Sequence, residues 1–198
     1  MNKKLNIKHK LFVISAPSGA GKTTLVNQLI KEVNLIAPIE KVVTYTTKRP
    51  RITETDKKDY HFLSVPEFEL KIEENFFLEW SKVYENYYGS PAHILENLQK
   101  SSFILIVDRL GAESLKKILN PKSASFIWIR VHNLEILRER LTLRSTENSE
   151  QIERRLKISL SEIEQEETNP IFEHHIYNEH FETAVEDLKN LLLSSLGD

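Results

Sequence analysis

Near the start of the chain stands the octapeptide Ala16-Pro17-Ser18-Gly19-Ala20-Gly21-Lys22-Thr23, from which the architecture follows. It comes directly after the apolar run 11–15, which reads as a buried strand, and directly before 24–30, whose apolar spacing reads as a helix. A phosphate-binding loop is expected in this context of strand, glycine-rich loop and helix. Small residues allow backbone N–H groups to surround phosphate oxygens, and the helix N-terminus adds favourable partial charge. The octapeptide therefore predicts binding of a nucleoside triphosphate.

Two side chains of this loop have distinct chemistry toward such a ligand. Lys22 would reach the β- and γ-phosphates, and the Thr23 hydroxyl would ligate Mg²⁺. The other predicted ATP contacts in this region are Ala16, Pro17, Ser18, Gly19, Ala20, Gly21 and Thr24. Ala16 stands where the strict motif has glycine, so the match is one residue short.

The composition is that of a globular enzyme without cysteine chemistry. Hydrophobic residues make up 40% of the chain and charged residues 28%, which argues against disorder. A net charge of −2 gives no electrostatic case for nucleic acid or an anionic membrane as a partner. The absence of cysteine excludes disulfides, zinc–thiolate sites and thiol nucleophiles. No stretch approaches a membrane span and the first apolar run is too short for a signal peptide, so we expect a cytoplasmic protein, monomeric or homodimeric.

Strand and helix patterns alternate along the chain. The expected strands are 11–15, 102–107, 124–130 and 172–177, and the expected helices are 22–33, 111–119, 133–143 and 181–196. The run 102–107 is continuously apolar, as in a strand buried on both faces of a parallel sheet. These patterns predict an α/β protein of the P-loop NTPase fold, with a doubly wound, mainly parallel sheet.

Two interruptions divide this pattern within one expected domain, 1–198. The expected core comprises 11–39, 101–143 and 169–198. The first interruption, 40–100, has short β-prone pieces and many charges, and predicts a small mixed α+β insertion, with helices opening at Ser64 and at Ser90-Pro91. The second, 144–168, is a highly charged helical stretch that predicts a lid. Insertions of this kind carry the acceptor site and the lid of a kinase.

The first insertion carries a resemblance to a known family. The segment Thr44-Tyr45-Thr46-Thr47-Lys48-Arg49-Pro50-Arg51, followed by Glu54 and by Asp59-Tyr60-His61-Phe62, is similar to the GMP-binding region of guanylate kinases. So is Phe77-Leu78-Glu79-Trp80, followed by Asn86-Tyr87-Tyr88-Gly89-Ser90. With the phosphate loop, these motifs stand in the family's order from about Leu11 to the last helix. The resemblance implies Mg²⁺-assisted phosphoryl transfer from ATP to GMP, and to dGMP.

The resemblance also implies the residues of the acceptor site. They are Thr44, Lys48, Arg51, Tyr60, Glu79, Tyr88, Ser90 and Asp108. Two cations and two phenols among them are a suitable cage for a phosphate dianion, because charge-assisted hydrogen bonds are strong. Glu79 is implied to accept from the N1–H and the 2-amino group of guanine, with Thr44 near O6 and Asp108 in support. Because adenine presents an acceptor at N1, such a site rejects the wrong base by about 10⁴-fold or more.

Arginines in and just before the second interruption match family positions that, by the resemblance, close over the phosphates. Arg140 and Arg144 are four residues apart, on one helix face, and Arg155 lies about three turns farther on. Phosphoryl transfer requires such groups because its catalysis is mostly alignment and neutralisation of charge. The implied catalytic residues are Lys22, Arg144 and Arg155. Arg140 and Asn178 are implied to bind ATP, with Asn178 near the adenine.

Five positions depart from the family pattern. Ile106 replaces an acid that is the natural candidate for water-mediated support of Mg²⁺, and Leu110 replaces a glutamine. Lys48 replaces an arginine and exchanges a bidentate fork for a point charge, while Thr53 and Lys57 stand at usual glycine positions. Two alternatives therefore remain open: a P-loop kinase of another nucleoside monophosphate, and a catalytically weak guanylate-kinase-like module that binds a partner protein.

Overall fold

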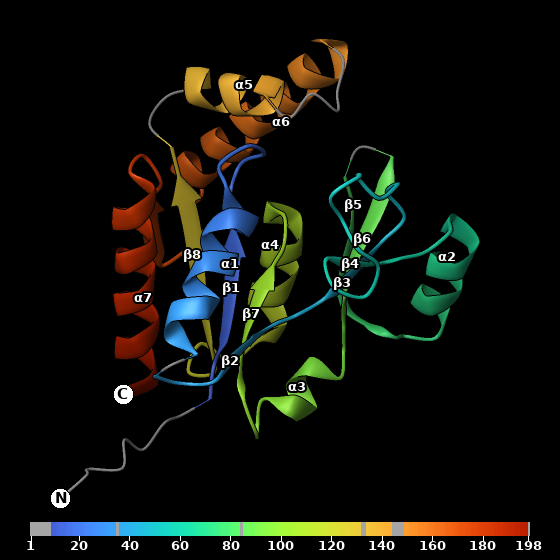
Figure 1. Ribbon diagram of the computed structural model, residues 1–198. Coiled ribbons are helices and arrows are strands. Elements are labelled where there is room, and N and C mark those ends of the chain that lie inside the picture. The colour runs from blue at the N-terminus through green and yellow to red at the C-terminus, as the bar shows by residue number, and fades with distance from the viewer. Residues whose placement is uncertain (1–8, 35, 84, 132–133, 144–148, 198) are drawn as a thin grey trace, which may run out of the picture.

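The computed structural model describes residues 9–34, 36–83, 85–131, 134–143 and 149–197 (Figure 1). The strands are β1 (Leu11–Ser15), β2 (Ile39–Lys41), β3 (Thr44–Thr46), β4 (Tyr60–Phe62), β5 (Phe77–Val83), β6 (Asn86–Pro91), β7 (Ser102–Ile106), β8 (Ala124–Arg130) and β9 (His174–Tyr177). The helices are α1 (Lys22–Val33), α2 (Val65–Glu73), α3 (Ile94–Asn97), α4 (Arg109–Ile118), α5 (Leu134–Leu143), α6 (Ser149–Thr168) and α7 (Phe181–Gly197).

A five-stranded parallel sheet forms the centre of the molecule, in the order β2-β7-β1-β8-β9. Strand β1 is buried along its whole length, and its side chains alternate between two apolar clusters. Phe12 and Ile14 pack with the residues of α1 and α7, whereas Leu11 and Val13 pack with those of α4. Helices thus cover both faces, as Figure 1 shows, and the predicted doubly wound α/β fold is confirmed.

Strand β2, at the edge of the sheet, was not predicted. Its Glu40 and Lys41, which the sequence assigns to the insertion, pair with Phe103 and Ile104 of β7. Only Ile39 of the three strand residues is buried. A strand this short, with a single buried side chain, has no periodicity that sequence reasoning can detect.

A second sheet, in the order β4-β3-β6-β5, lies beside the central one (Figure 1). Helix α2 packs on it through Phe68, whose ring stacks on Phe77 and Tyr87 with centroids 4.5 and 5.2 Å apart. The capping box predicted at Ser64 begins this helix. The helix predicted to open at Ser90-Pro91 begins later: both residues belong to β6, which pairs with β5, and the short helix α3 begins at Ile94.

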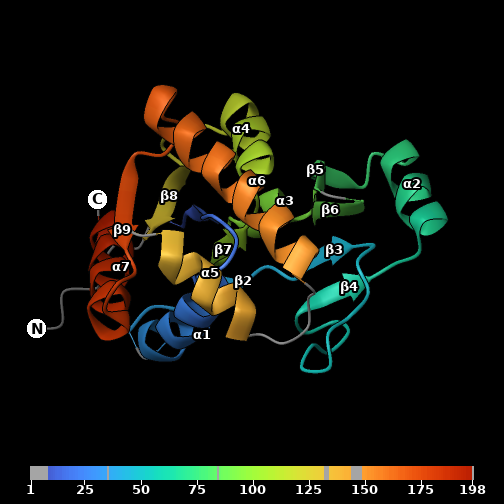
Figure 2. The same ribbon diagram turned by 90° about the horizontal axis from the view of Figure 1, so that it is seen from above.

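Helices α5 and α6 lie over the carboxyl ends of the central strands (Figures 1 and 2). Helix α6 is a single helix of 20 residues, which confirms the helical reading of this stretch. Arg144, predicted to be catalytic, lies outside the described residues, between 143 and 149. Among the helices of the described ranges, none combines the length and the apolar character needed to cross a membrane.

Candidate functional site

The phosphate loop requires glycine at Gly21 for two reasons. Its backbone has φ +85°, a left-handed conformation that L side chains rarely adopt. In addition, a Cβ there would stand 2.7 Å from the Nδ2 atom of Asn178. That amide is buried and donates to the Ala20 carbonyl at 2.7 Å, while Arg140 donates to the Asn178 carbonyl at 3.2 Å. Asn178 therefore supports the loop directly, and Arg140 supports it through Asn178.

One cleft extends from this loop to the second sheet. The predicted site residues that line it are Ala16, Pro17, Ser18, Gly19, Gly21, Lys22, Thr23, Thr44, Lys48, Arg51, Tyr60, Glu79, Tyr88, Ser90, Asp108 and Arg155. Four predicted ATP contacts, Ala20, Thr24, Arg140 and Asn178, are outside this lining. The chain thus brings both halves of the predicted site to one cleft.

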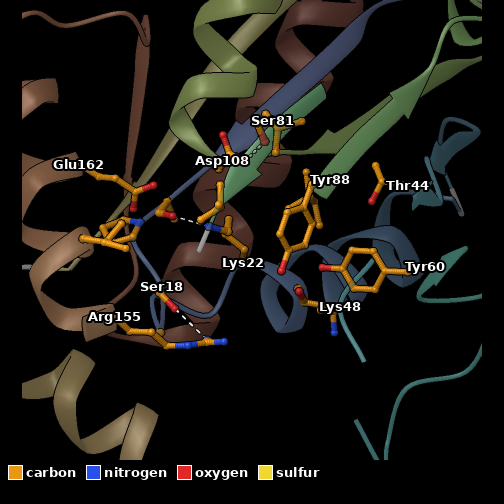
Figure 3. Close-up of a pocket in the computed structure, with 18 of the residues that line it drawn as sticks. Ser18, Lys22, Thr44, Lys48, Tyr60, Ser81, Tyr88, Asp108, Arg155 and Glu162 are labelled. Atoms are coloured by element: carbon orange, nitrogen blue, oxygen red, sulfur yellow. Dashed lines mark hydrogen bonds between the residues drawn. The ribbon is translucent and has the colours of Figure 1, made fainter. Parts of the chain in front are cut away.

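Helix α6 contacts the phosphate loop at one end of the cleft. The backbone N–H of Ser18 donates to the Ser159 hydroxyl at 3.1 Å, and Arg155 donates to the Ser18 hydroxyl at 3.3 Å (Figure 3). The Lys22 ammonium donates to the Ala16 carbonyl within the loop. These contacts place two cations, Lys22 and Arg155, on the phosphate loop itself.

Two half-buried phenols stand opposite the loop. The hydroxyls of Tyr60 and Tyr88 point toward one another in the cleft (Figure 3). Burial raises the pKa of Tyr60 to about 12 and also raises the pKa of Tyr88. Both hydroxyls therefore stay protonated at physiological pH and can donate to an anion.

The two cations on this side are held by a residue to which the sequence analysis gave no role. Lys48 lies 4.7 Å from the ring centroid of Tyr60, and burial lowers its pKa although the Glu54 carboxylate opposes that shift. Glu54 pairs with the Lys48 ammonium, accepts from the Arg51 backbone N–H at 2.8 Å and lies 3.8 Å from the Arg51 guanidinium. Glu54 stands in the quoted motif three residues after Arg51, which is the spacing of a turn.

Two further carboxylates, Glu79 and Asp108, line the cleft. Glu79 is buried and accepts from the Ser90 hydroxyl. Burial raises the pKa of Glu79 to about 7; the hydrogen bond from Ser90 opposes this shift and the Asp108 charge adds to it. Asp108 accepts from the Ser81 hydroxyl, and also from the Gly111 backbone N–H at 2.8 Å, which caps α4. A Cβ at Gly111 would stand 2.7 Å from Glu79, so this turn fits tightly against the carboxylate.

A further acid of the cleft, Glu162 on α6, was missed. Burial raises its pKa to about 7, with the charge of Asp108 adding to the shift and the Lys22 charge opposing it. Glu162 follows Arg155 by seven residues, close to two turns, so the two share a helix face. That spacing is the signal from which it could have been found.

The oxygen donors of the cleft suit a hard cation bound together with phosphates. Thr23, Asp108 and Glu162 all line it, whereas Ile106, which also lines it, offers no ligand. Within the described ranges, no three His, Asp or Glu side chains form a group that could hold a metal by themselves. This pattern fits Mg²⁺, which keeps several waters and is usually bound through one or two protein groups plus substrate phosphates.

The central sheet, the glycine-rich loop and the opposed polar walls define a P-loop nucleotide-binding α/β protein. A family model described as guanylate kinase matches residues 8–195. The chain belongs to the guanylate kinase family.

Individual relatives agree with this assignment over nearly the full chain. A guanylate kinase of Protochlamydia amoebophila is 39% identical over 190 residues, which cover 94% of this chain and 91% of that protein. A guanylate kinase of Myxococcus xanthus is 36% identical over 93% of this chain and 86% of the relative. The crystal structure of guanylate kinase from Anaplasma phagocytophilum superposes with a TM-score of 0.78 at 27% identity and covers 97% of this chain and 88% of that one.

Proposed function

We propose that this protein transfers the γ-phosphoryl group of ATP to the phosphate of GMP, and to that of dGMP. The observation that carries the proposal is the shared cleft: a phosphate loop faces two cations, two phenols and a buried carboxylate. A phosphate oxygen of GMP attacks the γ-phosphorus in line, the bond to the β-phosphate oxygen breaks and ADP leaves. A covalent enzyme intermediate is unnecessary because both substrates bind side by side.

On the donor side, Lys22 and the loop N–H groups bind the β- and γ-phosphates. Arg155, together with Arg144, neutralises charge that spreads over the transferring oxygens. Thr23 would hold Mg²⁺, which would supply positive charge to the phosphates of ATP. Arg140 and Asn178 contribute to ATP binding, and their contacts with the loop support that role.

On the acceptor side, the phosphate of GMP binds among Lys48, Arg51, Tyr60 and Tyr88. The guanine base binds at the far end, where Glu79 accepts from N1–H and the 2-amino group. Three other residues complete this end: Thr44, Ser90 and Asp108. Both substrates are small nucleotides, and we place the reaction in the cytoplasm, carried out by a monomer or a homodimer.

The Tyr60 hydroxyl provides a test of the phosphate cage. Tyr60→Phe should raise the KM for GMP about tenfold, because a hydrogen bond to a charged group is worth about 1.5–3 kcal/mol. The ring that contacts Lys48 remains, so kcat and the KM for ATP should stay within about threefold. Steady-state kinetics with each substrate varied in turn measures all three constants.

Tyr177→Phe is the matched control for this substitution. Tyr177 lies on β9, is 45% exposed and has its hydroxyl 3.4 Å from Arg130, away from the cleft. The control should leave every constant unchanged. An equal KM for GMP in Tyr60→Phe and in the parent protein would remove Tyr60 from the acceptor site.

The function itself is tested by coupled ADP release with Mg-ATP and a panel of GMP, dGMP, AMP, CMP, UMP and dTMP. Strong release with GMP and dGMP alone would support the proposal. Release with a different monophosphate would retain the mechanism and reassign the acceptor. If no monophosphate of the panel gave ADP release although calorimetry showed that ATP and GMP bind, the result would favour a module that binds a partner protein.

A further inference from the structure

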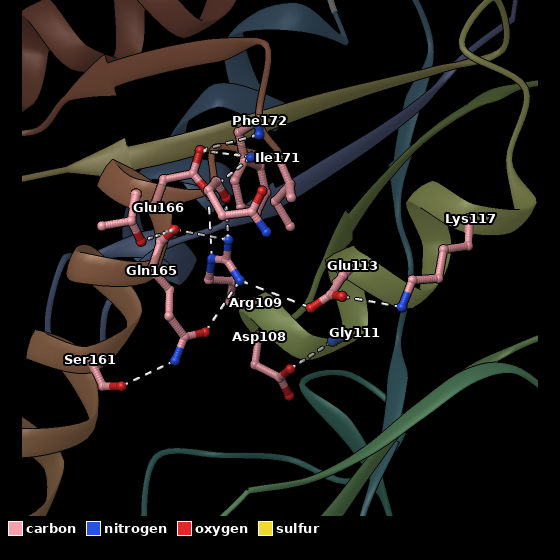
Figure 4. A network of polar contacts seen from close by, with 12 residues as sticks. Asp108, Arg109, Gly111, Glu113, Lys117, Ser161, Gln165, Glu166, Ile171 and Phe172 are labelled. Carbon is pink, nitrogen blue, oxygen red and sulfur yellow. Dashed lines mark hydrogen bonds and ion pairs between the residues drawn. The ribbon is translucent and has the colours of Figure 1, made fainter.

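Arg109 follows Asp108 directly and begins α4, yet its side chain is only 4% exposed. It extends away from the cleft to the C-terminal part of α6 (Figure 4). Its guanidinium Nε lies 3.5 Å from the carboxylate of Glu166, whose side chain is fully buried. The guanidinium also donates to the side-chain and backbone oxygens of Gln165, at 3.3 Å each, and to the Asn169 carbonyl at 2.7 Å.

The backbone of Arg109 contacts the same helix. The Arg109 backbone N–H and the Arg109 charge both oppose the rise in the pKa of Glu162, the α6 carboxylate that lines the cleft. Glu166, one turn farther along, also accepts from the backbone N–H groups of Ile171 and Phe172, at 3.2 Å. Two carboxylates of one helix face therefore lie near one residue, which stands next to Asp108.

We propose that Arg109 is a positioning residue that fixes α6 against the corner carrying Asp108, and thereby sets where Arg155 and Glu162 stand at the phosphate loop. Arg155 precedes Glu166 by eleven residues, roughly 16 Å of helix, so a tilt at one end displaces the other. Apolar contacts between helices are not directional, whereas the planar guanidinium fork specifies one orientation. The part of this proposal that concerns turnover rests on the proposed function.

The ion pair is tested with Arg109→Met, Glu166→Gln and the double variant. Each single variant removes the nearest counter-ion of a buried charge, leaving Arg109 with Glu113 at 4.0 Å or Glu166 with His175 at 3.7 Å, and should lower the melting temperature. The double variant removes both charges, and glutamine keeps an oxygen for the amides of Ile171 and Phe172, so its melting temperature should recover. Its kcat should nevertheless stay about tenfold to a hundredfold below the parent value, because a misplaced α6 no longer aligns Arg155. The KM values for GMP and ATP should change by less than about threefold.

A direct measurement of helix position does not depend on turnover. The chain has no cysteine, so Lys117→Cys on α4 and Lys157→Cys on α6 introduce two spin labels at exposed positions. Pulsed electron paramagnetic resonance measures the distance between the two labels. The distance distribution should be narrow in this labelled protein and broader when Arg109→Met and Glu166→Gln are added. Glu113→Gln is the control, because Glu113 lies 4.0 Å from Arg109 but on α4 itself.

The outcomes separate positioning from simple stabilisation. A broad distribution with low kcat in a stable double variant supports the proposal. Recovery of kcat along with the melting temperature, or an unchanged distance distribution, overturns it. Failure of the proposed function would instead appear as absence of ADP release from the unsubstituted chain, and it would leave the distance measurement unaffected.

Discussion

Replacing the ammonium of the phosphate loop in Lys22→Ala should lower the rate of phosphoryl transfer by about 10³-fold or more, because this charge neutralises the transferring phosphates. The acceptor half of the cleft is built from other elements, so GMP affinity should remain within about threefold. Quenched-flow single turnovers measure the rate, and calorimetry measures GMP binding. Turnover within about tenfold of the parent, or loss of GMP binding, would contradict the role given to Lys22.

The matched control removes a lysine from the same helix. Lys31 lies in the last turn of α1 and is exposed. Lys31→Ala removes the same positive charge outside the cleft, so its transfer rate should equal that of the parent. The comparison separates the position of Lys22 from the loss of one charge on α1.

The second large effect concerns selectivity for the guanine base of the acceptor. Glu79→Gln should lower the preference for GMP over AMP, measured as the ratio of kcat/KM values, by about 10²-fold or more. A carboxylate accepts from both donors on the Watson–Crick edge of guanine, whereas an amide offers one acceptor and its donors oppose those of guanine. In the parent protein, GMP affinity should rise as pH increases through about 7, where Glu79 ionises. The variant should lack that dependence.

The same substitution should stabilise the fold at alkaline pH. Burial raises the pKa of Glu79 from 4.5 to about 7, so the folded chain holds this proton more tightly than the unfolded chain. Below the unfolded pKa the carboxyl is neutral in both states; as pH rises through the folded pKa, ionisation costs stability. One pKa unit corresponds to about 1.4 kcal/mol, so the free energy of unfolding should increase by on the order of 3 kcal/mol near pH 8.

Urea denaturation at about pH 5 and about pH 8 measures this gain, which should be several times larger at the higher pH. Ser90 donates its hydroxyl to Glu79 in the parent, and the glutamine oxygen can accept the same bond. A stability difference that does not vary with pH, or an unchanged preference for GMP over AMP, would contradict the proposed position of Glu79 at the base.

Strands β1, β7 and β8 of the central sheet could be predicted because they are apolar runs, as buried strands require, whereas the three-residue edge strand β2 has no such pattern. Strand β1 and helix α1 begin and end where the sequence predicts, on either side of the glycine loop. The short strands of the second sheet have few buried residues, and the partner of Ser90 could not be inferred without knowing that β5 pairs with β6. Pairing between strands distant in sequence is a tertiary property that local patterns do not carry.

Site residues that belong to sequence motifs could be predicted. Site residues that are held in place only by tertiary contacts could not. Lys22, Tyr60 and Glu79 all line the cleft as expected. Glu162 was missed because a charged residue in a charged helical stretch reads as solvated surface. Arg109 was missed because its partners Glu166 and Asn169 lie far along the chain. Lys57, at a position where the resemblance implies glycine, has φ +64°, a left-handed conformation that favours glycine.

The internal hydrogen bonds of the phosphate loop have a consequence for the thermodynamics of ATP binding. The Ser18 N–H already has an acceptor in Ser159, and the Lys22 ammonium has one in the Ala16 carbonyl. An arriving phosphate replaces such partners rather than filling vacant positions, and exchanging one hydrogen bond for another yields little net free energy. The favourable free energy of binding comes instead from the attraction between the negative phosphates and the positive charges at the loop. The loop is already ordered by folding, so binding does not cost the entropy of ordering it.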